Sequence, residues 1–330
     1  MKIAVDGFGG DNAPQEIVKG AIMAVKARKD LEVVITGKKD LLEQLLAQEY
    51  YGDRISVYDC SDVITCEEEP VIAIRKKKDS SLVKTFELLK KGEADGAVSA
   101  GSSGAVLAGG VFILGRIDGV LRPCLIPELP TVKGGFVALS DCGANVDCKP
   151  EYIYQFAQMG AIYAKAVHDV DARVGLLNNG AEAGKGNDVV KQAYYMLKNS
   201  SLNFVGNCEA RDILSGDFDV VACDGFDGNI ALKSAEGTAN AVFTLMKESI
   251  NSSFRAKLGA LLMKPALKSL KKKLDYSEHG GAAVVGIKYP LVKCHGSSKA
   301  KSICAGILQC DNMAKNGLCK KIEEAFNVGE

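Results

Sequence analysis

Ile3-Ala4-Val5-Asp6-Gly7-Phe8-Gly9-Gly10-Asp11-Asn12-Ala13-Pro14 joins an apolar run, a glycine-rich turn and the beginning of a helical pattern. Asp11 and Asn12 can cap a helix that Pro14 opens, because short polar side chains satisfy the free N–H groups of a first turn. We expect the helix to face a sheet through Ile17, Ala21, Met23 and Ala24. A strand, a turn and a helix in this order are typical of parallel strands joined by helices.

The same order recurs through most of the chain. Five further apolar runs end in glycine-rich or polar turns, at residues 96–98, 136–139, 174–177, 220–223 and 291–294. We expect all six strand ends to lie at the carboxyl edge of one sheet, where open α/β folds bind ligands. The pattern predicts an α/β fold, a three-layer αβα arrangement around a mostly parallel sheet. Since no internal repeat or low-complexity linker interrupts it, we expect residues 1–330 to form a single domain.

Composition excludes several classes of protein. The 41 Lys+Arg residues balance 41 Asp+Glu residues, so the formal net charge is zero and no overall positive field favours nucleic acid. A chain that is 47% hydrophobic and 25% charged is not typical of disorder. No uncharged apolar run is long enough to span a membrane, and the N-terminal segment lacks a signal-peptide core. We therefore expect a cytoplasmic protein.

The cysteines and histidines do not form a metal-binding pattern. The chain has 11 Cys and 3 His, but no Cys-x-x-Cys pair and no histidines at zinc-ligand spacing. We expect the cysteines to be reduced and mostly buried. The turn at residues 7–11 does not match the dinucleotide fingerprint, and no ribose-binding acid follows the next strand. The sequence thus predicts no metal and no cofactor.

Two loops are candidates for phosphate binding. Gly101-Ser102-Ser103-Gly104 and His295-Gly296-Ser297-Ser298 each follow an apolar run and precede a helical pattern. Free backbone N–H groups at a helix start bind phosphate, and the serines add hydroxyl donors. Each loop alone is more simply explained as a tight turn that has a serine cap. A Ser–His pair at His295 is a further alternative, although no orienting acid is evident.

Two other turns supply candidate catalytic residues. Lys185 lies in a glycine-rich loop after residues 174–177, and its charge could hold an anion or stabilise an oxyanion. The alternative for this loop is a solvated surface segment. Residues 224–229 are predicted to form a polar turn, in which the amide of Asn229 could donate a hydrogen bond to an oxyanion. The sequence contains no conventional nucleophile constellation.

One segment is strongly basic. Residues 255–273 contain seven Lys or Arg and no acid, and Pro265 divides the stretch into two short helices. Apolar residues recur every three or four positions, which predicts a protruding amphipathic hairpin at about residues 248–275. Its candidate contact residues are Phe254, Leu258, Leu261, Leu262, Lys264 and Lys268.

Seven motifs stand in order along nearly the whole chain, at residues 5–14, 129–135, 141–150, 185–187, 206–212, 223–229 and 295–298. Together they resemble the bacterial phosphate acyltransferases of the PlsX type. The resemblance implies transfer of a long-chain fatty acyl group from an acyl-carrier-protein thioester to inorganic phosphate, for phospholipid (phosphatidic acid) synthesis. It also implies a homodimer with a fold similar to phosphotransacetylases and isocitrate/isopropylmalate dehydrogenases. Phosphate would be the nucleophile, which agrees with the absence of a catalytic triad.

The resemblance leaves three roles for the hairpin. It could attach the protein to the inner face of the cell membrane, near a membrane glycerol-3-phosphate acyltransferase. It could dock the acidic acyl carrier protein, or it could pack a dimer. Alternatives for the whole chain are a short-chain phosphotransacetylase that uses acyl-CoA, a noncatalytic membrane or carrier-protein adaptor, and, from the fold, a dehydrogenase.

Overall fold

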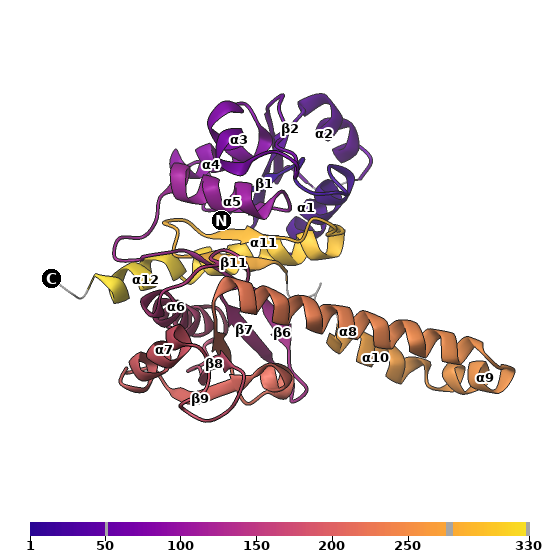
Figure 1. Ribbon diagram of the computed structural model, residues 1–330. Helices are drawn as coiled ribbons and strands as arrows, with labels where there is room; N and C mark the ends of the chain where they lie inside the picture. Colours follow the sequence, from indigo (N-terminus) through magenta and orange to yellow (C-terminus); the bar gives the residue numbers. More distant parts are fainter. Residues whose placement is uncertain (50–51, 275–279, 328–330) are drawn as a thin grey trace.

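The computed structural model describes residues 1–49, 52–274 and 280–327 (Figure 1). Within these ranges the chain forms two β-sheets covered by helices, with a helical protrusion at one side. Residue 275, where the predicted hairpin ends, and His279 lie outside the described residues.

The first sheet has seven strands, most of them parallel. Its order is β3 (Ile55–Asp59), β2 (Glu32–Gly37), β1 (Lys2–Asp6), β4 (Gly96–Ser99), β12 (Leu291–Lys293), β11 (Ala282–Val285) and β5 (Cys124–Ile126). Only β11 pairs antiparallel with its neighbours. Strand β1 is buried along residues 3–6, as is expected of a strand with helices on both faces.

The second sheet has five strands and is formed by the chain between β5 and β11. Its order is β6 (Glu128–Pro130), β7 (Phe136–Ser140), β10 (Val220–Ala222), β8 (Val174–Asn178) and β9 (Phe204–Glu209). The β6–β7 pair is antiparallel and the other pairs are parallel. The expectation of mostly parallel pairing is therefore confirmed.

The six predicted strand ends do not belong to one sheet, so that expectation was wrong. Strands β1, β4 and β12 end in the seven-stranded sheet, whereas β7, β8 and β10 end in the five-stranded sheet. The recurring strand–turn–helix pattern is local, and it does not specify which strands become neighbours. The antiparallel strands β11 and β6 carry no turn signal that would reveal the division.

Helices cover both sheets, and one of the buried apolar clusters extends across the two sheets. The seven-stranded sheet is accompanied by α1 (Gln15–Ala27), α2 (Lys39–Leu46), α3 (Pro70–Lys76), α4 (Ser81–Lys90), α5 (Ser103–Gly109), η1 (Gly110–Leu114) and α11 (Ala300–Lys315). The five-stranded sheet is accompanied by α6 (Pro150–His168), α7 (Asp188–Lys198), η2 (Ala210–Ser215) and α12 (Leu318–Phe326). One continuous cluster of buried residues includes Val5 and Ala138, one from each sheet.

Helix α1 begins at Gln15, directly after Pro14, which is its N-cap. No side chain makes a capping hydrogen bond there, so the predicted capping by Asp11 and Asn12 was wrong. Its buried face contains Ile17, Ala21 and Ala24, as expected. Met23, however, is 42% exposed, so its placement toward the sheet was wrong. At 3.6 residues per turn, Met23 lies about 120° around the helix from Ile17 and points away from the packed face.

The protrusion consists of three helices. Its long arm is α8 (Gly225–Asn251), and the chain returns along it through α9 (Phe254–Leu262) and α10 (Lys264–Leu274) (Figure 1). The break between α9 and α10 falls at Met263, two residues before Pro265. No described helix is long and apolar enough to cross a membrane.

Candidate functional site

Strand ends from both sheets line a cavity of about 430 Å³, which we call the inter-sheet cavity. The seven-stranded sheet contributes the turn after β4 and the end of β12. The five-stranded sheet contributes β6, the turn after β7 and the first turns of α8. The carboxyl ends of parallel strands therefore meet here, although they belong to different sheets.

Both predicted phosphate loops reach this cavity. Ser102 and Ser103 line it from the start of α5, and His295, Gly296 and Ser298 line it from the turn before α11. Gly104 and Ser297 belong to the same two loops but are not among the lining residues. The structure thus brings together two loops that are about 190 residues apart in the sequence.

The loop after β1 supports both of these turns. Asp6 accepts a hydrogen bond from the Ser99 hydroxyl at 2.7 Å, and the Ser99 oxygen accepts one from the Gly101 N–H at 3.0 Å. The Asn12 amide donates to the carbonyl of Ser297 at 3.0 Å. A side chain at Gly9 would meet the Asp6 carboxylate and the Gly101 backbone, so this close approach requires glycine.

His295 presents a donor to the cavity. Its Nδ1 accepts a hydrogen bond from the Ser297 backbone N–H at 3.2 Å, which leaves Nε2 to carry the proton of the neutral ring. Nε2 lies 3.4 Å from the Lys233 ammonium of α8. Burial and the nearby lysine lower the pKa of His295, and this keeps the ring neutral at pH 7. Two donors that face each other in this way can be bridged by an anion.

The predicted Ser–His pair is present in geometry but does not have the arrangement of a nucleophile. The Ser297 hydroxyl lies 2.8 Å from Nδ1 of His295, yet Ser297 is not among the residues that line the cavity. The same Nδ1 also accepts the Ser297 N–H, so this contact closes the turn.

Lys293 is the buried cation of the cavity. It is the last residue of β12 and is only 8% exposed, and its ammonium donates a hydrogen bond to the carbonyl of Cys294. Burial lowers its pKa. A buried charge is costly without a partner, so an anion that enters the cavity would gain a strong charge-assisted interaction here.

Asn229 lies on α8 and not in a polar turn, so that part of the prediction was wrong. Asp224 is the N-cap of α8, and its carboxylate accepts a hydrogen bond from the Asp227 N–H at 2.7 Å. The helix consequently begins at Gly225, and Asn229 lies in its second turn, where it lines the inter-sheet cavity beside Gly143.

Buried Asp141 orders the turn after β7, and the Asn145 carbonyl of that turn accepts a hydrogen bond from the Gly225 N–H at the start of α8 at 2.7 Å. The Asp141 carboxylate accepts hydrogen bonds from the backbone N–H groups of Leu125 and Asn145 at 2.8 and 2.7 Å. A side chain at Gly228 would come within 2.0 Å of the Asp141 carbonyl, so α8 approaches this strand end only because residue 228 is glycine. Burial raises the pKa of Asp141 to about 6.

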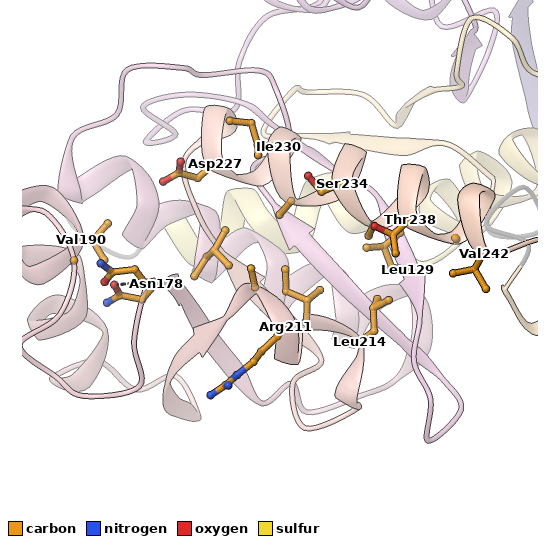
Figure 2. A pocket seen from close by; sticks show the side chains of 18 of the residues that line it. Leu129, Asn178, Val190, Arg211, Leu214, Asp227, Ile230, Ser234, Thr238 and Val242 are labelled. Atoms are coloured by element: carbon orange, nitrogen blue, oxygen red, sulfur yellow. Dashed lines mark hydrogen bonds between the residues drawn. The ribbon is translucent and has the colours of Figure 1, made fainter. Parts of the chain in front are cut away.

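A second, larger cavity of about 1070 Å³ lies on another face of α8 (Figure 2). Most of its lining is aliphatic, from α8, β6, η2 and α10. We call it the apolar cavity. Leu129 lines both cavities, which places them side by side.

Comparison with known proteins shows the family of this chain. The model of a family described as "Fatty acid synthesis protein" matches residues 1–321. The phosphate acyltransferase of Bacillus cereus (strain G9842) is 51% identical over 315 residues, which cover 95% of this chain and 94% of the relative. The phosphate acyltransferase of Bacillus cytotoxicus is 50% identical over the same length. The chain belongs to the phosphate acyltransferase family.

Solved structures confirm the predicted fold. A phosphotransacetylase from Streptococcus pyogenes is similar with a TM-score of 0.62 and 18% identity, and covers 95% of this chain and 94% of its own. A 4-hydroxythreonine-4-phosphate dehydrogenase from Klebsiella pneumoniae is similar with a TM-score of 0.54, 14% identity and coverage of 95% and 99%. At these identities the likeness concerns the fold alone.

Family membership confirms three predictions from the sequence. The chain is an enzyme, it is a phosphate acyltransferase, and it acts in fatty acid and phospholipid synthesis. The carrier-protein donor, the homodimer, the membrane attachment and the individual site residues stay predictions.

Lys185 lies apart from the inter-sheet cavity of this phosphate acyltransferase. It is exposed, in the loop between β8 and α7, and its side chain packs over Gly180. Its carbonyl accepts a hydrogen bond from Asn178, which lines one end of the apolar cavity. The structure therefore associates Lys185 with the apolar cavity and Asn229 with the inter-sheet cavity.

The predicted contact residues of the protrusion are exposed. Phe254 is 82% and Leu262 is 78% exposed, and Leu258 and Leu261 are also more than half exposed. Lys264 and Lys268 lie on α10, and their side chains are exposed.

Sequence reasoning missed Lys293, Lys233 and Glu128. Lys293 had a signal, because it is the one charged residue in the apolar run at 291–294. Lys233 had no clear signal, since a lysine on a long helix is usually solvated. Glu128 is buried at the cavity wall and accepts a hydrogen bond from Tyr163 at 2.6 Å, a partner 35 residues away that the sequence does not reveal.

Proposed function

We propose that this enzyme transfers a long-chain fatty acyl group from the thioester of acyl carrier protein to inorganic phosphate. The product is an acyl phosphate for phosphatidic acid synthesis. The observation that supports the proposal most strongly is the buried cation of Lys293 in a cavity that is also lined by Lys233, His295 and the two serine loops.

In this proposal the inter-sheet cavity binds phosphate. Lys293 supplies positive charge, and Lys233 adds a second ammonium that lies 3.5 Å from the Glu236 carboxylate. The Nε2–H of His295 supplies a neutral donor. Hydroxyl groups of Ser102, Ser103 and Ser298 and backbone N–H groups of the turns at Gly104 and Gly296 complete the donor set. Ser297 supports this set indirectly, because its N–H donates to Nδ1 of His295. Bound in this way, phosphate is held next to the thioester, so that attack becomes effectively unimolecular.

Phosphate oxygen then attacks the thioester carbonyl carbon, and negative charge develops on the carbonyl oxygen. The amide of Asn229 donates a hydrogen bond to that oxygen. Collapse of the intermediate breaks the carbon–sulfur bond, and the carrier thiolate takes up the proton that phosphate gives up. The overall change is thioester plus hydrogen phosphate to acyl phosphate plus thiol, with no covalent intermediate on the protein.

We assign Lys185 a catalytic role from the other side of α8. Its exposed ammonium lies on the loop that forms one end of the apolar cavity. From there it is proposed to hold an anionic group of the acyl donor while the donor's carbonyl lies at Asn229. The proposal for Lys185 rests on its positive charge and on its position in this loop, whereas Asn229 lines the inter-sheet cavity directly.

The basic protrusion is proposed to contact an acidic or anionic surface. Its exposed Phe254, Leu258, Leu261 and Leu262 can enter the interface of a membrane, and Lys264 and Lys268 favour anionic lipid. We propose reversible attachment to the inner face of the cell membrane, close to the glycerol-3-phosphate acyltransferase that uses the product. A homodimer and a carrier-protein contact on the same helices are further parts of the proposal.

The experiment is a comparison of acyl donors with the purified enzyme. Palmitoyl-carrier protein is incubated with and without phosphate, and thioester loss is followed together with acyl phosphate trapped as hydroxamate. We expect both signals only when phosphate is present, with far weaker activity on acetyl-CoA. Exclusive use of acetyl-CoA would show a short-chain phosphotransacetylase, and absence of acyl phosphate at any enzyme concentration would show a noncatalytic adaptor. Either result would overturn the proposal.

A further inference from the structure

The apolar cavity lies along the side of α8, and none of its lining residues is assigned to phosphate binding. Ile230, Ser234, Thr238 and Val242 stand in a row on α8 and face into it (Figure 2). Ala231, Ala235 and Ala239 lie on the same face. Spacing of three or four residues brings all of them to one side of the helix, and their small side chains leave the space open.

Dimensions and chemistry of this cavity suit a hydrocarbon chain. Its volume of about 1070 Å³ lies just above the range of roughly 300–1,000 Å³ for small-molecule sites. Lining residues on α8 run from Asp227 to Met246, a distance of about 28 Å along the helix axis. One lipid chain occupies about half of a ~30 Å hydrocarbon core, so a long chain fits lengthwise.

The apolar cavity adjoins the inter-sheet cavity at one point. Leu129 of β6 lines both cavities. Successive residues in the early turns of α8 line one cavity or the other. Asn229 and Lys233 face the inter-sheet cavity, whereas Ile230 and Ser234 face the apolar cavity. A group whose reactive end lies at Asn229 can therefore extend its tail past Leu129 into the apolar cavity.

We propose that the apolar cavity binds the fatty acyl chain of the donor, with the chain lying along α8 from Leu129 toward Val242. This inference rests on the proposed function and adds the site that measures chain length. Leu214 of η2 and Leu270 of α10 close the groove on the sides away from α8. Because α10 belongs to the protrusion, the far end of the chain lies next to the helices that are proposed to contact the membrane.

A cavity-filling variant tests the site. Each buried methylene contributes about fourfold to binding, so blocking three of them lowers the preference for a long chain by about 60-fold. Several lining residues are already alanine, so truncation of side chains is not informative here. The test instead enlarges Ala239 in two steps, Ala239→Leu and Ala239→Trp. The ratio of kcat/KM for palmitoyl-carrier protein to that for butyryl-carrier protein is expected to fall moderately in the first variant and about 60-fold in the second.

Ala241→Trp is the matched control, because Ala241 is exposed on the same helix and lines neither cavity. The control is expected to keep the ratio of the unmodified enzyme. An unchanged ratio in both Ala239 variants would overturn the chain site. So would a change from dimer to monomer in Ala239→Trp with the ratio unaltered, because the groove would then be covered by a second copy of the chain. Absence of acyl phosphate from every donor, in the unmodified enzyme as well, would instead refute the proposed function.

Discussion

At the scale of single residues, burial determines the electrostatic character of the inter-sheet cavity. Lys293 is a buried cation, and His295 is held neutral by burial and by Lys233. Asp141 lies behind the cavity wall, where its hydrogen bonds order the turn after β7, to which the start of α8 is hydrogen-bonded. The cavity thus combines charge for an anion with rigid support for the amide of Asn229.

Asn229 is expected to act on the transition state and not on substrate binding. Asn229→Ala should lower kcat by about 100- to 1,000-fold, the usual effect of removing one oxyanion donor, with KM for phosphate nearly unchanged. Steady-state kinetics with palmitoyl-carrier protein measure both constants. Asn240→Ala, which removes an exposed asparagine of the same helix, is the control. A large rise in KM with normal kcat would contradict the assignment.

Lys185→Ala tests the proposed charge on the β8–α7 loop. We expect kcat to fall at least tenfold, since one charge-assisted hydrogen bond contributes roughly 1.5–3 kcal/mol. Lys191→Ala, on the following helix α7, should leave turnover normal. Circular dichroism of both variants checks the fold. Normal turnover by a folded Lys185→Ala protein would remove Lys185 from the catalytic residues.

The raised pKa of Asp141 predicts a pH-dependent stability. Its pKa moves from 3.8 to about 6 on folding because burial disfavours the carboxylate. The folded protein then binds the proton more tightly than the unfolded chain. This stabilisation is complete below pH 4 and is lost as pH rises through 6. The free energy of unfolding of the unmodified protein, minus that of Asp141→Asn, should be about 2 kcal/mol larger at pH 4.5 than at pH 7.

Urea denaturation at the two pH values measures this difference. The comparison of two proteins cancels the other carboxylates, which titrate in both. A difference that stays constant, or that grows as the pH rises, would show that Asp141 is charged in the folded protein throughout this range.

At the scale of elements, α8 joins the chemistry to the protrusion. Its first two turns present Asn229 to the inter-sheet cavity, its middle turns line the apolar cavity, and its last turns pack with α9. The sequence predicted the basic, amphipathic character of residues 255–273 from their spacing. It did not predict one uninterrupted helix from Gly225, because residues 224–229 contain two glycines and resemble a turn. The Asp224 cap and close packing on Asp141 override that local signal.

The tip of the protrusion is expected to bind anionic membranes. Leu258→Glu combined with Leu262→Glu should weaken sedimentation with vesicles that contain anionic lipid by at least tenfold. Burial of one leucine is worth about 1.5–3 kcal/mol, and the new charges also repel the surface. Activity in solution should persist. Val132→Glu with Val146→Glu, two exposed apolar positions outside the protrusion, is the control. Unchanged sedimentation of the leucine variant would argue against membrane attachment.

At the scale of the whole molecule, function arises where two sheets meet. The sequence predicted the α/β class, most strand ends and both serine loops, because these depend on local periodicity and turn chemistry. It could not predict the division into two sheets, since pairing is a long-range property. For the same reason Lys233 and Glu128 were missed: the neighbours that place them at the cavity are distant in the sequence.

The central claim is that the inter-sheet cavity binds phosphate as the acyl acceptor. Its most direct test is the KM for phosphate of Lys293→Ala, measured with saturating palmitoyl-carrier protein. Loss of a charge-assisted contact predicts a rise of about 10- to 100-fold. Lys288→Ala, an exposed lysine just before β12, should keep the KM of the unmodified enzyme. A folded and active Lys293→Ala enzyme with an unchanged KM for phosphate would contradict the account.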